Sequence, residues 1–126
     1  MAFDIPTTPP RRIGIVGTRT RDSIVDLQLT IEAFRKIHRP GDMIVSGGCP
    51  QGGDRFAELI ARKRGLVMTT YYPDWDGVGR GAGFARNQDI ADNCDILIAV
   101  VSIERKGGTE DTIARAQKLG KQIILV

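Results

Sequence analysis

The sequence has 126 residues, of which 41% are hydrophobic and 26% are charged, and its formal net charge is +3. This length predicts one domain whose core is stable without disulfides or structural metals, and the composition is ordinary for a soluble globular protein. No apolar run approaches the roughly 20 residues that cross a bilayer, so we expect no membrane partner. The first ten residues lack the regions of a signal peptide, so we expect a cytoplasmic location.

Two cysteines and one histidine predict neither a disulfide framework nor a zinc site. We therefore expect no metal and no cofactor. The basic residues are mostly spread along the chain, whereas binding to nucleic acid needs them clustered as well as in excess. Duplex DNA binding is unsupported on this ground.

Short apolar runs and amphipathic segments alternate along the chain after a loose tail at residues 1–11. Ser23 and Asp26 resemble a capping box at the start of the first helix, and Pro40 and Gly41 stop it. The segment 73–83 has no regular pattern. Strands are expected at 12–17, 42–45, 66–72, 95–101 and 122–126, and helices at 24–37, 56–64, 84–93 and 109–119.

This alternation predicts an α/β, doubly wound, mainly parallel and Rossmann-like sheet of five strands, with helices on both faces. The expected strand order is 3-2-1-4-5, so the switch point lies between the first and fourth strands. The domain is expected to span residues 12–126. Ligands bind such sheets outside the carboxyl ends of the strands.

Four segments are expected to meet at this edge, and each contains candidate ligand-binding residues. They are Gly17, Thr18 and Arg19 after the first strand; Gly47, Gly48, Gly53 and Asp54 after the second; Trp75, Arg86 and Asn87 after the third; and Gly107, Gly108 and Thr109 after the fourth. Neither the G-x-G-x-x-G fingerprint of dehydrogenases nor a P-loop is present at these turns.

Four glycines within residues 47–53 exceed what a strand–helix connection needs, which favours close approach of backbone to an anion. Asp54 is expected to be the N-cap of the following helix rather than a ligand contact. Arg19 could pair with a phosphate at the switch point.

The segment 107–111 has two interpretations. Thr109 caps a helix whose N-terminus is favoured by Glu110 and Asp111, or Gly107, Gly108 and Thr109 hold a phosphate. In the second case Glu110 or Asp111 faces a ribose or a reacting sugar carbon. Arg86 and Asn87 could clamp a phosphate and read a base or ribose, and Trp75 could stack on a base.

Taken together, these motifs resemble the SLOG superfamily of Rossmann-like nucleotide-binding proteins, and its single-domain YspA-like branch in particular. The matching segments are Gly17-Thr18-Arg19, Val45-Ser46-Gly47-Gly48 with Gly53-Asp54-Arg55, Pro73-Asp74-Trp75 with Gly83 and Arg86-Asn87, and Gly107-Gly108-Thr109. The glycine loop after the second strand has one extra residue. The resemblance covers residues 12–126.

The resemblance implies a domain that binds a nucleotide or a nucleotide-derived small molecule, as a sensor or ligand-binding module, and that self-associates into a homo-oligomer. One related branch, the Lonely Guy enzymes, implies an alternative, phosphoribohydrolase action on nucleoside monophosphates with Glu110 and Asp111 as catalytic acids. Lys106 replaces the proline of that motif. The DNA-processing protein A branch implies a further alternative, binding of single-stranded nucleic acid.

Overall fold

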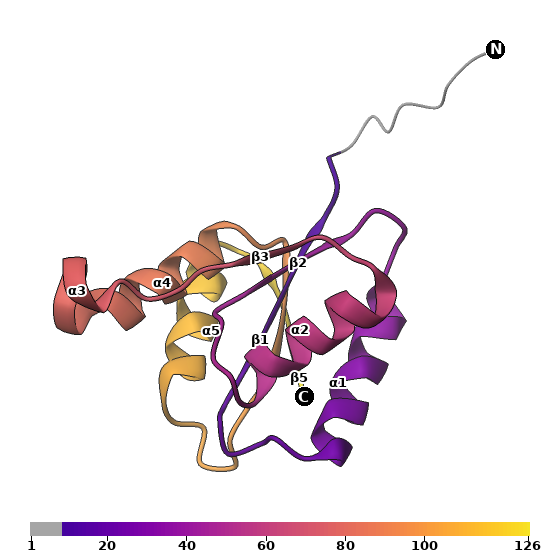
Figure 1. Ribbon diagram of the computed structural model, residues 1–126, viewed down its shortest axis with the longest axis horizontal. Coiled ribbons are helices and arrows are strands. Elements are labelled where there is room, and N and C mark those ends of the chain that lie inside the picture. The colour runs from indigo at the N-terminus through magenta and orange to yellow at the C-terminus, as the bar shows by residue number, and fades with distance from the viewer. Residues whose placement is uncertain (1–8) are drawn as a thin grey trace.

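The computed structural model describes residues 9–126, which form one five-stranded sheet (Figure 1). All neighbouring strands run parallel, in the order β3-β2-β1-β4-β5. The predicted fold class and strand order are therefore confirmed. The strands are β1 (Arg12–Gly17), β2 (Met43–Ser46), β3 (Met68–Thr70), β4 (Ile96–Val100) and β5 (Gln122–Leu125).

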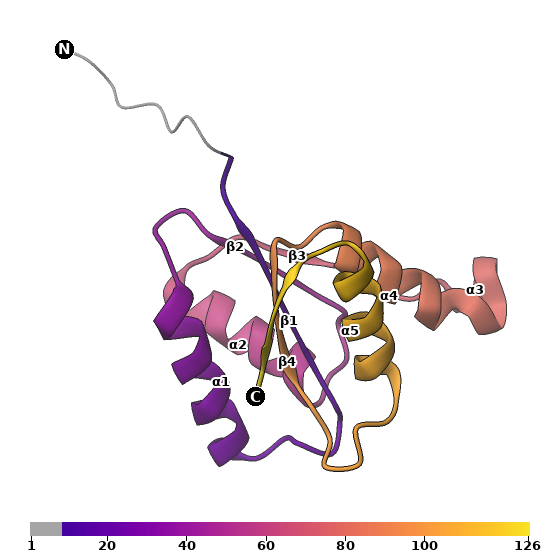
Figure 2. The same cartoon turned by 180° about the vertical axis from the view of Figure 1, so that it is seen from behind.

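Helices cover both faces of the sheet, α1 and α2 on one side and α4 and α5 on the other (Figures 1 and 2). A short helix, α3, lies beyond the sheet before the first turn of α4, and we call α3, α4 and the 3₁₀ turn between them the α3–α4 arm. The helices are α1 (Ile24–Ile37), α2 (Gly53–Arg64), α3 (Trp75–Val78), α4 (Ala82–Asp92) and α5 (Gly108–Lys118), with a 3₁₀ turn at Gly79–Gly81.

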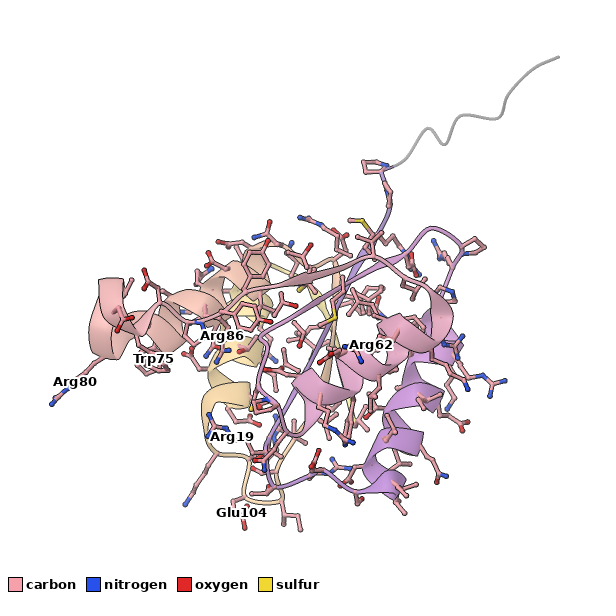
Figure 3. All side chains as sticks on the ribbon, in the orientation of Figure 1. Arg19, Arg62, Trp75, Arg80, Arg86 and Glu104 are labelled. Carbon is pink, nitrogen blue, oxygen red and sulfur yellow. The ribbon has the colours of Figure 1, made fainter. Side chains whose placement is uncertain are left out.

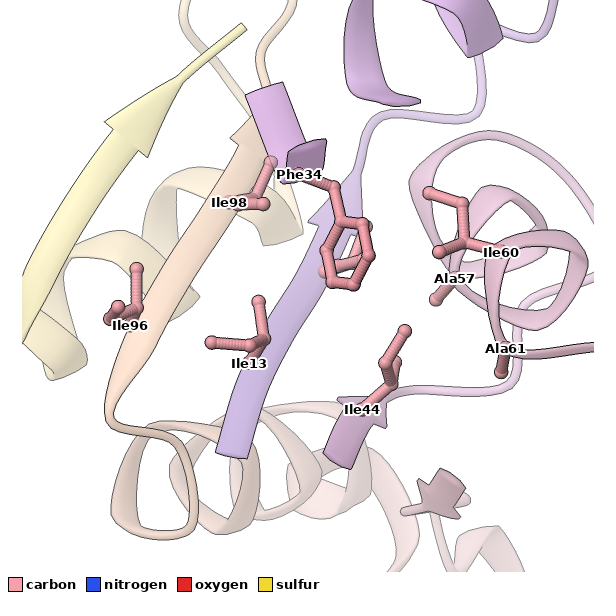
Figure 4. Close-up of a cluster of buried hydrophobic side chains, with 9 residues drawn as sticks. Ile13, Phe34, Ile44, Ala57, Ile60, Ala61, Ile96 and Ile98 are labelled. Atoms are coloured by element: carbon pink, nitrogen blue, oxygen red, sulfur yellow. The ribbon is translucent and has the colours of Figure 1, made fainter. Parts of the chain in front are cut away.

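The core has two layers because successive side chains of a strand point to opposite faces. Ile13 of β1 and Ile98 of β4 are fully buried against α1 and α2, where Phe34 fills the centre (Figure 4). Leu97 faces the other way, into the cluster under α4 and α5. Burial on both faces explains why β4 reads as a continuous apolar run.

β1 and β4 are in register from Ile13 with Ile96 to Gly17 with Val100, so both strands end at the same level. The loops that follow them begin side by side, and the Thr18 backbone N–H donates to the Val100 carbonyl at 3.0 Å. This register places the predicted switch point, between β1 and β4, at the carboxyl edge of the sheet.

Several element boundaries differ from the sequence-based expectations. The capping box of α1 is confirmed, with Ser23 as N-cap and Asp26 as its partner. The N-caps expected at Asp54 and Thr109 are wrong, because α2 and α5 begin two residues earlier than those caps require and have Gly52 and Gly107 as their N-caps. β3 is shorter than expected, and the segment expected to be irregular contains α3 and the 3₁₀ turn.

The domain boundary expected at residue 12 stays a prediction, since residues 1–8 of the expected tail lie outside the described residues. Arg11, at the end of that tail, is joined to the domain by a salt bridge of 2.8 Å to the buried carboxylate of Asp42. Within residues 9–126, no helix is long and apolar enough to cross a membrane.

Candidate functional site

A cavity of about 330 Å³ opens at the carboxyl edge of the sheet, between the ends of β1, β2 and β4 and the helices α4 and α5. We call it the edge cavity. It contains nine of the predicted ligand-binding residues: Gly17, Thr18, Arg19, Asp54, Arg86, Asn87, Gly107, Gly108 and Thr109. The fold thus brings the predicted residues of the first and fourth segments, Asp54 of the second and the start of α4 from the third to a single hollow.

The other predicted site residues do not line the edge cavity: Gly47, Gly48, Gly53, Trp75, Glu110 and Asp111. Trp75 lies on the α3–α4 arm, where it is 59% exposed and covers Gly83 (Figure 3). Arg80 projects from the same arm, away from the body of the protein.

The glycines beside the cavity have packing roles that explain their number. A Cβ on Gly53 would lie 2.2 Å from the Val16 carbonyl carbon, so helix α2 starts against the backbone of β1 only because residue 53 has no side chain. A Cβ on Gly47 would lie 2.7 Å from Arg86 Nη1 and 2.9 Å from Asp54 Oδ2. The glycine-rich loop therefore permits close packing of the protein on itself.

Gly107 differs from these, because its φ is +102° and a Cβ there would meet no other atom within 4 Å. It is the N-cap of α5, and no side chain caps this helix. The first backbone N–H groups of α5 therefore lack a capping partner, and they carry the partial positive charge of the helix N-terminus next to the cavity.

Asp54 is buried, 8% exposed, at the inner wall of the edge cavity. Its Oδ2 accepts the backbone N–H of Cys49 at 3.0 Å, and its Oδ1 lies 3.0 Å from the Ser46 hydroxyl. Burial raises the pKa of Asp54, and the hydrogen bonds together with the charge of Arg86 offset this only in part. Asp54 joins α2 to the loop before it instead of capping the helix.

Arg86 connects α4 to the loop after β2. Its Nη1 donates to the Gly47 carbonyl at 2.7 Å, and its Nε donates to Asn87 Oδ1 at 3.0 Å. These two bonds use two of the five guanidinium N–H groups, which leaves donors for a ligand. Arg19 and Arg86 lie in the same region of the molecule in Figure 3.

The charges that line the cavity are three cations and one carboxylate. Asp54 is the carboxylate, and Arg86 lies close enough to lower its pKa. Arg19 and Lys106 are exposed, and within residues 9–126 neither makes a salt bridge. The hollow therefore has an excess of positive charge and suits an anion.

The two candidate catalytic acids are engaged in ion pairs at the start of α5. Glu110 forms two bonds with the Arg105 guanidinium, at 2.8 and 3.0 Å. Asp111 accepts from Arg115 Nε at 2.8 Å and from Asn87 Nδ2 at 3.0 Å. The structure brings neither carboxylate into the cavity lining.

Sequence reasoning left Cys49 and Lys106 out of the site, although both line the cavity. Cys49 lies inside the glycine-rich loop and Lys106 lies directly before Gly107, so both are neighbours of predicted site residues. Their position at the carboxyl ends of β2 and β4 was a usable signal. Within the described residues, no cluster of three or more histidine, cysteine or acidic side chains could hold a metal ion.

A second hollow of about 480 Å³ runs between α2 and the edge strand β3. Cys49 and Asp54 border both hollows, so these two residues form part of the wall between them. Tyr72 lines the second one and is 72% exposed. The tyrosine ring packs on the backbone of Gly48, where a Cβ would lie 2.4 Å from the ring.

Neither a protein-family model nor a curated protein matches the chain. Solved structures with the same fold include the molybdenum cofactor binding protein of Rippkaea orientalis, with a TM-score of 0.73 and 23% identity over 94% of this chain and 77% of that one. Two structures of the molybdenum cofactor carrier protein of Chlamydomonas reinhardtii have TM-scores of 0.70 and 0.69 and 24% identity, over 92% and 93% of this chain and 76% of each neighbour. At this level of identity, the likeness establishes the Rossmann-like fold.

Proposed function

We propose that the protein binds a nucleotide or nucleotide-derived ligand, with the anionic group of the ligand in the edge cavity. The observation that carries this proposal is the charge of the lining, in which Arg19 and Lys106 are free of salt bridges with described residues and a single carboxylate opposes them. The uncapped start of α5 adds unpaired N–H groups to the same wall.

Binding of AMP, adenosine and inorganic phosphate, measured by calorimetry, tests this proposal. We expect AMP and phosphate to bind and adenosine to bind more weakly, because adenosine lacks the anion. The double variant Arg19→Met with Lys106→Met should lose most of the affinity for AMP. Its matched control replaces two exposed cations outside the lining, Arg80→Met with Lys63→Met, and should bind as the natural protein does. Absence of heat with a broad panel of nucleotides would refute the proposal.

A second candidate ligand is a molybdenum cofactor. The support is the similarity in fold to two proteins whose names state that they bind or carry this cofactor. Molybdenum measured by mass spectrometry in protein purified from a host that makes the cofactor would favour this candidate, and the Arg19→Met and Lys106→Met variant should then copurify with less metal.

Phosphoribohydrolase activity remains an alternative proposal that follows from the Lonely Guy resemblance. The pairing of Glu110 with Arg105 and of Asp111 with Arg115 leaves Asp54 as the carboxylate that lines the edge cavity. Release of free base from nucleoside monophosphates at high protein concentration tests this activity. If release occurs, Asp54→Asn should reduce it more than Glu110→Gln.

Membership of the SLOG superfamily stays a proposal that rests on the motifs and the fold. Self-association into a homo-oligomer is also a proposal, and light scattering tests it.

Binding of single-stranded nucleic acid would need Trp75 and Arg80 on the α3–α4 arm. A salt-sensitive shift of an oligonucleotide in a gel, abolished by Trp75→Ala, would support this binding.

A further inference from the structure

Asn87 lies where the two sides of the edge cavity meet, and it is only 6% exposed. Its Oδ1 accepts from Arg86 Nε at 3.0 Å. Its Nδ2 donates to Asp111 Oδ2 at 3.0 Å and to the Gly108 carbonyl at 3.3 Å. Both hydrogens of the amide nitrogen are therefore used within the protein, and the oxygen has one of its two acceptor positions filled.

The orientation of this amide is dictated by its neighbours. The oxygen faces a guanidinium, which only donates, and the nitrogen faces a carboxylate and a carbonyl, which only accept. Turning the amide over would set N–H groups against Arg86 and an oxygen against Asp111. All three bonds would be lost, so a single rotamer satisfies both sides.

Side-chain bonds extend from Asn87 in both directions. On one side Asp111 is held by Arg115 Nε at 2.8 Å, within helix α5. On the other side Arg86 reaches the Gly47 carbonyl at 2.7 Å, after strand β2. A continuous chain of charge-assisted bonds thus links α5 to the glycine-rich loop across α4, and such bonds are stronger than those between neutral groups.

We infer that Asn87 is a positioning residue, which fixes the guanidinium of Arg86 and the start of α5 in one arrangement so that both can bind the same anion. This inference rests on the proposed function for its consequence in binding, but its geometric part concerns the protein alone. Asn87 then sets the affinity of the edge cavity for the anion. It does not contact the base or ribose of a ligand, which is the role that the sequence suggested.

The geometric part is tested by the side-chain Nε–H resonance of Arg86 in ¹⁵N-labelled protein without ligand, assigned by its disappearance in Arg86→Lys. We expect Asn87→Ala to speed hydrogen exchange at this Nε–H by about tenfold or more, since a bond to a charged group is lost. The matched control is Asn93→Ala on the C-terminal side of the same helix, where Asn93 Oδ1 accepts from Arg12 at 3.3 Å. The control should leave the Arg86 resonance unchanged.

The consequence for binding is tested with AMP. Asn87→Ala should weaken AMP about tenfold, and Asn93→Ala should not. Asn87→Asp should also weaken AMP, because it sets one carboxylate against Asp111 and adds a negative charge to the lining of the edge cavity.

The possible results separate the inference from the proposed function. An Arg86 Nε–H that is unaffected by Asn87→Ala in a folded protein would overturn the positioning role, and a loss of AMP affinity in that case would assign Asn87 to direct contact. If the natural protein binds neither AMP nor phosphate, the proposed function fails, while faster exchange at Arg86 would still support the positioning role.

Discussion

The hydroxyl of Ser46 lies between two oxygens, 2.6 Å from the Ile15 carbonyl and 3.0 Å from Asp54 Oδ1. A hydroxyl has one hydrogen, so Ser46 shares it between the Ile15 carbonyl and the carboxylate of Asp54. The bond from Ser46 lowers the pKa of Asp54, but burial is the larger effect and raises the pKa above its ordinary value.

The first prediction concerns the pH dependence of stability. A raised pKa in the folded state means that the folded protein binds more protons than the unfolded chain, so the contribution of Asp54 to stability falls as pH rises from about 4 through the folded pKa. Asp54→Asn imitates the protonated acid, with Nδ2 donating to Ser46 and Oδ1 accepting from Cys49. The variant should gain stability relative to the natural protein between pH 4 and pH 8.

Urea unfolding at intervals over that range measures this effect. The control is Asp76→Asn on the arm, which measures the effect of replacing an exposed aspartate outside both hollows over the same range. A relative stability of Asp54→Asn that falls with pH would show that folding lowers the pKa of Asp54, which would contradict the argument from burial.

The second prediction concerns the contact between α2 and β1. Gly53→Ala places a methyl group 2.2 Å from the backbone of Val16. Val16 lies in β1, and this central strand cannot move away from the methyl group because it is paired on both sides. We expect a loss of stability of about 3 kcal/mol or more, at the upper end for overpacking. Gly108→Ala is the control, because it also starts a helix but has only the Asn87 amide nitrogen at 4.0 Å. Equal stability of the two variants in urea would contradict the packing argument.

Much of the fold was predictable because the signals were strong and local. β4 is buried on both faces and appears in the sequence as an uninterrupted apolar run. The capping box at Ser23 is complete within four residues. β3 was expected to be longer, because Val67 and Tyr72 have strand propensity but lie exposed beside the edge of the sheet, where pairing stops.

The place where the candidate residues gather was predictable, and the contacts that they make were less so. The carboxyl-edge rule brought Arg19, Arg86 and Gly108 together correctly, since it depends only on topology. The role expected of Asp54 was wrong because its partners Ser46 and Cys49 precede it across a folded loop, which no helix-capping pattern encodes. Pairing of Glu110 with Arg105 likewise depends on the conformation of the loop before α5, where Arg105 has a φ of +54°.

The third prediction concerns the salt bridge that fastens Arg11 to the domain. Asp42 is buried, and burial alone would raise its pKa, but hydrogen bonds from Arg11 and the Arg39 backbone lower the pKa overall. Asp42→Ala should cost about 3 kcal/mol, since it leaves a partly buried guanidinium without its partner. The lowered pKa adds stability that is present above pH 4 and is lost as pH falls below it, so the cost should shrink in acid.

Urea unfolding at pH 7 and pH 3 tests this prediction. The exposed pair of Arg62 with Glu58 provides the comparison, and Glu58→Ala should cost less than about 1 kcal/mol at pH 7. A cost for Asp42→Ala that is equally small would mean that Arg11 is not held by the domain, and a cost that is the same at both pH values would contradict the pKa argument.

The fourth prediction uses the two cysteines to report on the edge cavity. Cys94 is fully buried, and burial raises the pKa of its thiol to about 11, so it should be inert in the folded protein. Cys49 is only partly buried and lines the cavity, so iodoacetamide should label it alone, as measured by mass spectrometry of the peptides. AMP should slow the labelling of Cys49 if the ligand occupies this hollow, and unfolding in urea should expose both thiols. Labelling of Cys49 that saturating AMP does not slow would place the nucleotide elsewhere, and labelling of Cys94 at a similar rate without urea would contradict the packing of the core under α4 and α5.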